Sequence, residues 1–220
     1  MRRNVKILAV MVTMVFLAAG IWGIWNKQSY TDVASEENPL EYFQVAPYSP
    51  QLTDMIWDGS LQDSVKEEAS YIVKVKAVEK LHLQFKDSTQ KVVVEEVFWG
   101  SGLEKGDIIE VQKQGGRAYF DDNSWSMDMN FTNQMTVGEE YLVYLKNKVE
   151  TFYPEDQIYQ TVDFLISPIF AYREVENVLP EQPARYVPYT ELKDNEFFAM
   201  DEDVLAALEK FKDDLMEGYR

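Results

Sequence analysis

The chain has 220 residues, with 38 acidic and 21 basic side chains, a net charge of −17 and no cysteine. The missing cysteine excludes disulfides, thiolate metal sites, cysteine nucleophiles and a thioether-linked lipid anchor. The negative charge repels phosphate groups, so we expect no binding to nucleic acid. Aromatic residues make up 14% of the chain, which is enough apolar material for one folded domain rather than a disordered acidic segment.

One uncharged apolar stretch lies near the N-terminus. Residues 7–25 read ILAVMVTMVFLAAGIWGIW, 19 residues without a charged side chain. As a helix, this stretch would extend about 28 Å, close to the roughly 30 Å hydrocarbon thickness of a bilayer. Arg2, Arg3 and Lys6 precede it, and flanking basic residues stay on the cytoplasmic side. We therefore expect a single-pass signal anchor in the plasma membrane, with residues 1–6 cytoplasmic and the C-terminal domain outside.

A cleaved signal peptide is the alternative interpretation of the same stretch. Leu17-Ala18-Ala19-Gly20 offers small residues after a short apolar run, as a cleavage site requires. Cleavage would release a soluble secreted protein. The apolar run continues from Ile21 to Trp25, which favours an uncleaved anchor but leaves both interpretations open.

The remaining residues divide into three predicted parts. Residues 26–58 contain Pro39, Pro47 and Pro50 with little periodicity, which is typical of a tether or loosely packed approach segment. Residues 59–178 should form the main domain, and residues 179–220 a C-terminal extension. A short helix is expected over residues 60–69, with Ser64-Val65-Lys66-Glu67 as a capping box at a helix start.

Short strands dominate the middle of the sequence. Alternating or β-branched runs predict strands at residues 71–78, 81–85, 91–98, 107–112, 140–146, 159–166 and 169–175. Ser88-Thr89 and Gln114-Gly115-Gly116 are expected to form turns, and residues 100–106 a loop. No strand–helix–strand alternation is present, so a mainly β fold, either a barrel or a sandwich, is favoured over a parallel sheet.

The C-terminal extension predicts one amphipathic helix, at about residues 202–217. Asp201 can cap its start, and Gly218 can follow its end. One face carries an apolar stripe of Val204, Leu205, Leu208, Phe211 and Leu215. We expect this stripe to pack against the domain rather than to recruit a partner helix.

Residues 60–145 resemble bacterial exported domains that are similar to the tissue-inhibitor-of-metalloproteinases and netrin module. The resemblance lies in the order of several short motifs. They are a helix end at Glu68-Ala69-Ser70 that leads into the strand Tyr71-Ile72-Val73-Lys74-Val75, then Val92-Val93-Val94-Glu95-Glu96-Val97-Phe98-Trp99-Gly100, Leu103-Glu104-Lys105-Gly106-Asp107-Ile108-Ile109-Glu110-Val111, Gln114-Gly115-Gly116 and Val137-Gly138-Glu139-Glu140-Tyr141-Leu142-Val143-Tyr144-Leu145. It implies a small OB-like antiparallel barrel. Together with the transmembrane helix and the flanking helices expected from the residues themselves, the predicted fold class is mainly β. Val75 stands where that group often has glycine, and Trp99 where it often has lysine. The cysteine with which the animal module engages zinc is missing, so that inhibitory mechanism is not implied here.

The sequence carries few signs of catalysis. His82 is the only histidine, it lies in an alternating strand pattern that points it to solvent, and no Gly-x-Ser-x-Gly motif is present. We therefore predict no catalytic residue, no metal ligand and no cofactor. The oxygen-rich segment 121–128 could accommodate calcium, but its spacing does not match an EF-hand loop.

We expect the most plausible binding surface to be the loop after Gly116. Its acidic and aromatic side chains could contact a ligand or partner; the candidates are Tyr119, Asp121, Asp122, Trp125, Asp128 and Phe131. The sequence thus favours a membrane-anchored extracytoplasmic module that binds an unknown protein or glycan. The alternatives are an assembly subunit of a cell-envelope complex that associates through the C-terminal helix, and a carboxylate-dependent hydrolase.

Overall fold

The computed structural model divides into two units, Met1–Glu37 and Asn38–Arg220. It describes residues 2–29, 38–45, 50–83, 87–113, 118–121, 124–153, 155–162, 165–181 and 186–220. Within these ranges, the structure describes the backbone but not the side chains of residues 2–6, 8–10, 26–29, 50–52, 118–121, 124 and 125. The expected turn at residues 114–116 falls outside the described part of the chain.

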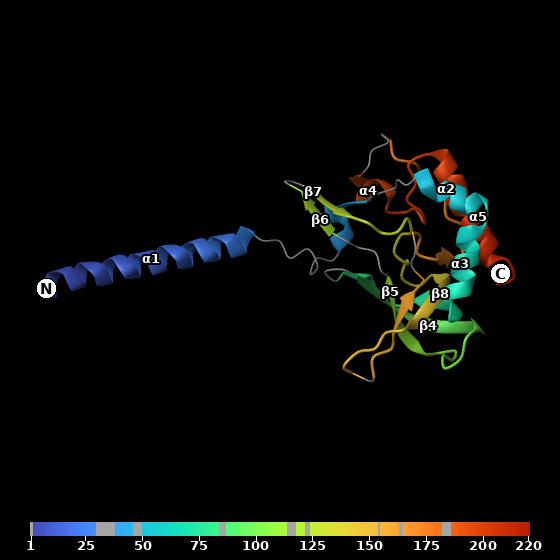
Figure 1. Ribbon diagram of the computed structural model, residues 1–220, viewed down its shortest axis with the longest axis horizontal. Helices are drawn as coiled ribbons and strands as arrows, with labels where there is room; N and C mark the ends of the chain where they lie inside the picture. The colour runs from blue at the N-terminus through green and yellow to red at the C-terminus, as the bar shows by residue number, and fades with distance from the viewer. Residues whose placement is uncertain are drawn as a thin grey trace. The chain divides into compact units, whose positions relative to one another are not determined.

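The first unit contains the helix α1 (Arg2–Ser29) (Figure 1). Its described side chains are exposed, and they include Phe16, Ile21, Trp22 and Trp25, each more than 60% accessible. Across the described residues of both units, none of the helices combines the length and the apolarity that a membrane span needs.

The second unit is mainly β and is built on a closed barrel of five strands. These strands are β2 (Tyr71–Ala77), β4 (Ser88–Trp99), β5 (Ile108–Lys113), β8 (Glu140–Lys148) and β9 (Ile158–Thr161). They pair in the order β2-β4-β5-β9-β8 and close between β8 and β2. Every pairing is antiparallel except that of β5 with β9, which is parallel. Two short strands extend the sheet: β3 (His82–Leu83) pairs with β4, and β10 (Ile169–Ala171) pairs with β8.

Alternation along the strands separates two cores. On β8, Tyr141, Val143 and Leu145 face the barrel interior, whereas Leu142 and Tyr144 join the core outside the barrel wall. This explains why β8 is buried on both faces and reads as an unbroken apolar run. The inner core fills the barrel, and the outer core lies between the barrel and a layer of helices.

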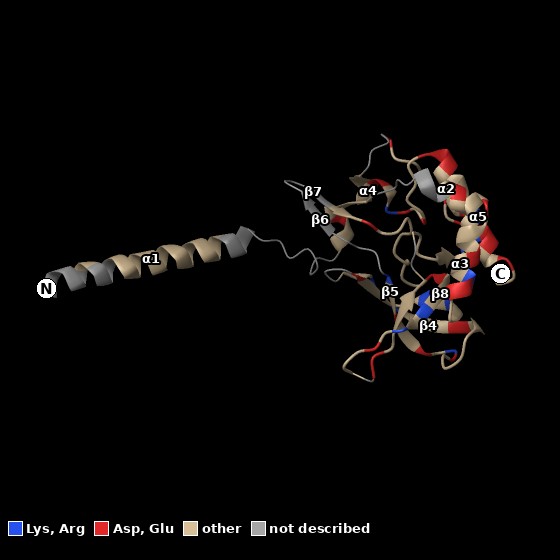
Figure 2. Cartoon of the chain, in the orientation of Figure 1, with Lys and Arg blue, Asp and Glu red and all other residues tan. Residues whose placement is uncertain are grey.

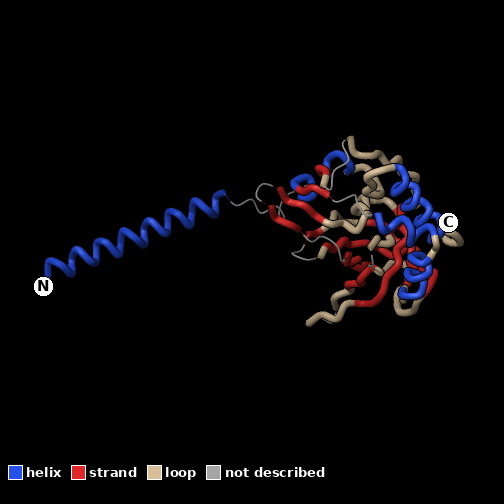
Figure 3. Tube along the Cα trace, turned by 45° about the horizontal axis from the view of Figure 1, so that its top comes forward, coloured by secondary structure: helices blue, strands red, loops and turns tan. Residues whose placement is uncertain are grey.

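Three helices form that layer, namely α2 (Pro50–Trp57), α3 (Ser60–Glu68) and α5 (Glu202–Met216). They lie together on one side of the barrel in both views (Figures 1 and 3). The predicted stripe of α5 is confirmed as a packing face, because Val204, Leu208, Phe211 and Leu215 are buried in the outer core. Leu205 is only partly buried against the same core. The predicted cap is also confirmed, since Val204 N donates to Asp201 Oδ1 at 2.9 Å.

A second sheet has the strand order β11-β1-β7-β6. Its strands are β1 (Phe43–Val45), β6 (Ala118–Asp121), β7 (Ser124–Met127) and β11 (Val187–Pro188). The 3-10 helix η2 (Pro39–Tyr42) precedes β1, and the short helix α4 (Tyr189–Leu192) follows β11. The approach segment expected over residues 26–58 is therefore shorter than predicted. The folded unit begins at Asn38, and β1 is held on both sides by β7 and β11.

The predicted capping box at Ser64 is wrong. Helix α3 begins one turn earlier, at Ser60, after Gly59 in a left-handed conformation. The carboxylate of Asp58 accepts from Ser60 N at 2.9 Å and so takes up a free donor of the first turn. Ser64 lies inside the helix, where its Oγ donates to Ser60 O at 2.8 Å.

The predicted turn at Ser88-Thr89 is also wrong. Both residues belong to β4, pair with Leu83 and His82 of β3, and are buried. The expected strands at residues 159–166 and 169–175 are shorter, since β9 ends at Thr161 and β10 at Ala171. Polar residues do not end a strand where its neighbours on both sides satisfy the backbone, as β3 and β5 do here.

Candidate binding surfaces

The segment predicted to be a binding loop forms the β6–β7 hairpin. Tyr119 pairs with Ser126, and Asp121 pairs with Ser124. The hairpin extends the second sheet through the parallel pairing of β7 with β1. Asp122 lies outside the described residues, as do the side chains of Tyr119, Asp121 and Trp125. For these four residues, the contribution to a binding surface stays a prediction.

The other two residues of the predicted surface lie in different surroundings. Asp128 is exposed, and its Oδ1 accepts from Asn130 N at 3.0 Å. Phe131 is only 7% exposed and belongs to the outer core. Asn130 and Phe131 both have positive φ angles, 49° and 58°, which turn the chain inward at this point. Including Phe131 in an exposed aromatic surface was therefore wrong, although Met127, Met129 and Phe131 alternate in the sequence as buried residues do.

Among the aromatic residues of the folded unit whose side chains are described, the two most exposed lie in the loop between β8 and β9, which sequence reasoning did not single out. The relative exposure of residue Phe152 is 101%, and that of Tyr153 is 65%. The loop projects from the barrel in two views (Figures 1 and 3). Fully burying a phenylalanine side chain is worth on the order of 2–3 kcal/mol. The sequence does carry a signal for an exposed aromatic loop. Phe152 and Tyr153 are adjacent, lie between acidic residues and belong to a segment without strand alternation.

Hydrogen bonds connect the described residues of this loop. At its base, Val149 N donates to Ile158 O, and Glu110 N of β5 donates to Gln157 O, both at 2.8 Å. At its tip, Thr151 Oγ1 donates to Tyr153 O at 2.8 Å and accepts from Tyr153 N at 3.2 Å. The two aromatic residues therefore belong to a segment whose backbone is hydrogen-bonded to Thr151 and, at its base, to the barrel.

The β8–β9 loop is acidic. Glu150 and Glu155 are exposed and Asp156 is partly exposed, and residues 149–157 include no basic residue. Figure 2 shows acidic residues and no basic ones along this loop. Lys148, at the end of β8, donates to Gln157 Oε1 at 3.1 Å. The surface thus combines exposed aromatic rings with local negative charge.

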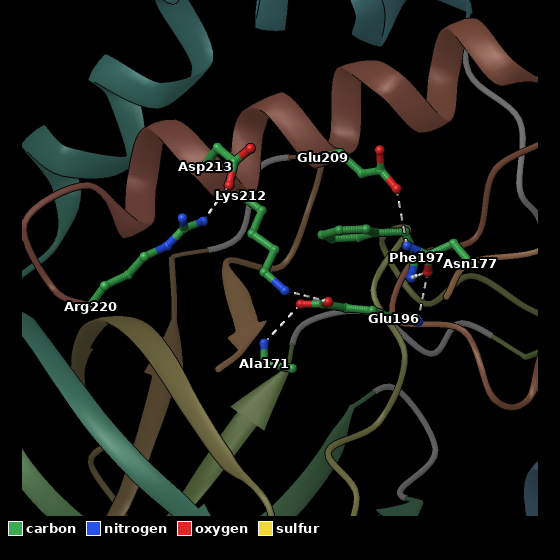
Figure 4. A network of polar contacts seen from close by, with 8 residues as sticks. All are labelled: Ala171, Asn177, Glu196, Phe197, Glu209, Lys212, Asp213 and Arg220. Carbon is green, nitrogen blue, oxygen red and sulfur yellow. Dashed lines mark hydrogen bonds and ion pairs between the residues drawn. The ribbon is translucent and has the colours of Figure 1, made fainter. Parts of the chain in front are cut away.

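A second polar cluster is buried and joins α5 to the barrel (Figure 4). Glu196 Oε1 accepts from Ala171 N at 2.8 Å, and Glu196 Oε2 lies 2.6 Å from Lys212 Nζ. Asn177 Oδ1 accepts from the backbone N–H groups of Glu196 and Phe197, at 2.9 and 3.1 Å. Burial raises the pKa of Glu196, and Lys212 and the Ala171 N–H hold that rise back. Because only 5% of the Glu196 side chain is exposed, this cluster fixes α5 and does not present a carboxylate to a ligand.

Sequence reasoning also missed the Glu196 cluster. Glu196 and Lys212 are 16 residues apart, and Ala171 is 25 residues before Glu196. No local periodicity links residues at these separations, so only the folded chain brings them together.

His82 is exposed on β3, as predicted, and pairs with Thr89 through the backbone. In the described part of the chain, no three His, Cys, Asp or Glu side chains are placed to hold a metal ion. Whether the acidic hairpin tip accommodates calcium stays a prediction, because Asp122 and the side chain of Asp121 are not described.

Comparison with protein-family models finds no family that matches the chain. Comparison with curated proteins finds no sequence relative.

Proposed function

We propose that this protein is a single-pass membrane-anchored module that binds a partner outside the cytoplasm and has no catalytic site. The observation that carries the proposal is α1. Residues 7–25 have no charged side chain, and the described apolar side chains of this helix, such as Phe16, Ile21 and Ile24, are exposed to solvent. In water, such a surface is strongly unfavourable, whereas in a bilayer it is the favoured arrangement. The anchor is proposed from this uncharged sequence, while none of the described helices has the length and apolarity of a membrane span.

We further propose that the barrel is OB-like. Numbered one to five in chain order, the barrel strands β2, β4, β5, β8 and β9 are arranged around the barrel in the order 1-2-3-5-4, and strand 4 closes onto strand 1. Strands 3 and 5 are parallel. This connectivity supports an OB-like arrangement and is compatible with the resemblance to netrin-like exported domains. OB-like barrels commonly bind ligands on one face and its neighbouring loops, which supports a binding role without identifying the ligand.

The negative charge of the domain restricts the chemical class of its ligand. Residues 27–220 carry all 38 acidic side chains but, without Arg2, Arg3 and Lys6, only 18 of the 21 basic ones, a net charge of about −20. Such a domain repels nucleic acid and the surface of an anionic bilayer. An extracytoplasmic protein or glycan is the proposed partner, and the β6–β7 hairpin with Tyr119, Asp121, Asp122, Trp125 and Asp128 is the proposed contact predicted from sequence.

The structure favours this role over that of an assembly subunit joined through α5. The apolar face of α5 is buried in the core of its own chain, where Phe211 contacts Phe170 with 5.7 Å between ring centroids. That face is therefore not available to a second protein.

The absence of cysteine allows a direct topology test with single introduced cysteines. Asn4→Cys probes the N-terminus, and Ser101→Cys probes the exposed β4–β5 loop. In intact cells, a membrane-impermeant maleimide should label the Ser101→Cys chain, and should label the Asn4→Cys chain only after lysis. The protein should remain with the membrane after carbonate washing, and deletion of residues 7–25 should remove it from that fraction.

Two results would contradict the proposal. One is a Ser101→Cys chain that stays protected in intact cells. The other is a mature protein that begins after Gly20, detected by its intact mass, which would establish the cleaved and secreted form instead.

A further inference from the structure

We propose that the described residues of the β8–β9 loop, 149–153 and 155–157, form a docking element that inserts Phe152 into an apolar pocket of a protein partner whose rim carries Lys or Arg. The proposal deepens the proposed function, on which it rests, by adding a contact site distinct from the β6–β7 hairpin and by specifying the chemistry of the partner.

The shape of the loop selects a protein over a small ligand. Small-molecule and sugar sites are concave and bury most of the ligand, whereas this loop projects from the barrel with residue Phe152 101% exposed (Figure 1). A protruding aromatic side chain suits the opposite role, in which it fills a pocket on another surface, as the central contacts of protein interfaces do. Tyr153, also exposed, can extend the same contact.

Order in the loop is the second argument. Binding is weakened when a flexible segment has to be fixed on contact. Here Thr151 bonds both the N–H and the carbonyl of Tyr153, and Asp156 N donates to Tyr153 O at 3.1 Å. Hydrogen bonds from Val149 N to Ile158 O and from Glu110 N to Gln157 O tie the base of the loop to the barrel. These bonds restrain the backbone on either side of Phe152 before any partner binds.

Charge decides which kind of protein fits. In the sequence, Glu150 precedes the aromatic pair, and Glu155 and Asp156 follow it. The basic residue that precedes the loop, Lys148, donates to Gln157. Complementary charge speeds association and suppresses wrong partners. A second copy of this chain, with the same acidic loop and a net charge of −17, would be repelled. A basic partner surface fits the loop.

Site-specific photo-crosslinking on the full-length chain in its own membrane tests this assignment. The photoreactive residue p-benzoylphenylalanine is placed at position 152, and in separate variants at positions 119 and 125 of the hairpin and at position 42. Tyr42 is the control for the β8–β9 loop, because the residue is 51% exposed and belongs to η2; its neighbour Phe43 pairs with Trp125 of the hairpin, so position 42 does not serve as a control for the hairpin. We expect crosslinking to a protein from position 152 and none from position 42.

Capture of a protein does not by itself support the assignment. The crosslinked surface of that protein must also be basic. The crosslinked peptide, identified by mass spectrometry, should contain or adjoin Lys or Arg. The combined substitution of Glu150→Gln and Glu155→Gln should lower the crosslinking yield, and so should added salt. With the identified partner purified, Phe152→Ala should weaken binding by about 10- to 100-fold, whereas Tyr42→Ala should leave it unchanged. Both variants should unfold at the same temperature as the unmodified protein, because neither side chain is buried.

The remaining outcomes overturn the assignment and separate it from the proposed function. Crosslinks from positions 119 or 125 but not 152 would place binding at the hairpin and leave the binding function intact. Crosslinks from position 152 to lipid, or to an acidic protein surface, would reject the partner chemistry. No protein crosslink from any of these positions would count against both proposals.

Discussion

Lys212 Nζ of helix α5 lies 2.6 Å from Glu196 Oε2, and this ion pair is largely removed from solvent. Only 5% of the Glu196 side chain and 16% of that of Lys212 are exposed. The other carboxylate oxygen accepts from Ala171 N of β10, at the edge of the barrel. One carboxylate therefore connects the last helix to the sheet, and its charge state should influence the stability of the whole unit.

The stability of the domain should depend on the protonation of Glu196. Burial raises the pKa of Glu196 above its ordinary value of 4.5. A raised carboxyl pKa means that the folded state binds the proton more tightly than the unfolded state. The resulting stabilisation is complete below the unfolded-state pKa and is lost as pH rises through the folded-state pKa. The free energy of unfolding of the unmodified protein minus that of Glu196→Gln should therefore decrease from pH 4 to pH 8 in urea titrations. A difference that increases over this range would contradict the assigned direction.

Removing the lysine should destabilise more than neutralising the carboxylate. At pH 7, Lys212→Ala leaves a buried carboxylate without its counter-ion, a loss on the order of 3–5 kcal/mol. Glu196→Gln keeps an acceptor for Ala171 N and leaves Lys212, which is 16% exposed, free to reach water. The double variant should recover part of the loss caused by Lys212→Ala. Urea unfolding of the four proteins measures this, and equal losses in both single variants would show that burial of the charge is not the controlling cost.

Gly100 should not tolerate a side chain. A Cβ at this position would lie 2.5 Å from Tyr71 Cδ1 and 2.7 Å from Ser70 O, and φ is +106°. Gly100→Ala should lower the free energy of unfolding by roughly 2–5 kcal/mol, since backbone strain and steric overlap act together. Gly102→Ala is the control, because φ is +91° there but no atom lies within 4 Å. Thermal unfolding should show a clearly larger loss at Gly100, and a similar loss at both sites would mean that the contact with Tyr71 is unimportant.

Gln90 should contribute to stability through the backbone of Met135. Its Nε2 donates to Met135 O at 2.6 Å, and its Oε1 accepts from Met135 N at 3.0 Å. Gln90→Ala leaves both buried backbone groups without that partner, which should cost about 2–4 kcal/mol in chemical unfolding. Gln112→Ala on β5 removes a partly exposed bond to Asp87 and should change stability by less than about 1 kcal/mol. Equal losses of unfolding free energy in Gln90→Ala and Gln112→Ala would contradict the expected contribution of the two hydrogen bonds to Met135.

Helix α5 should be required for folding of the domain. Phe211 is fully buried in the outer core, so Phe211→Ala should cost roughly 3–5 kcal/mol. Deletion of residues 201–220 should abolish the cooperative thermal transition. Glu209→Ala, on the exposed side of the same helix, should have little effect on the transition temperature. A truncated chain that still unfolds cooperatively near the original temperature would show that the barrel is independent of α5 and would reopen the role of this helix in assembly.

Local patterns in the sequence were sufficient for several elements. Alternation identified β2, β5 and β8, and the spacing from Val204 to Leu215 identified both the helix α5 and its buried face. These features depend on neighbouring residues alone, because helix and strand periods are set by the backbone within a few residues. The uncharged apolar run over residues 7–25 can be recognised from the sequence for the same reason.

Only the tertiary structure decided the features that depend on residues far apart in the chain. Ser88 and Thr89 are polar and suggested a turn, yet β3 and β5 on either side make them part of a strand. Phe131 belonged to a predicted loop surface, but two residues with positive φ turn it into the core. The exposure of Phe152 and the pairing of Glu196 with Lys212 likewise follow from packing. Burial and long-range pairing are properties of the assembled layers, so no local sequence period encodes them.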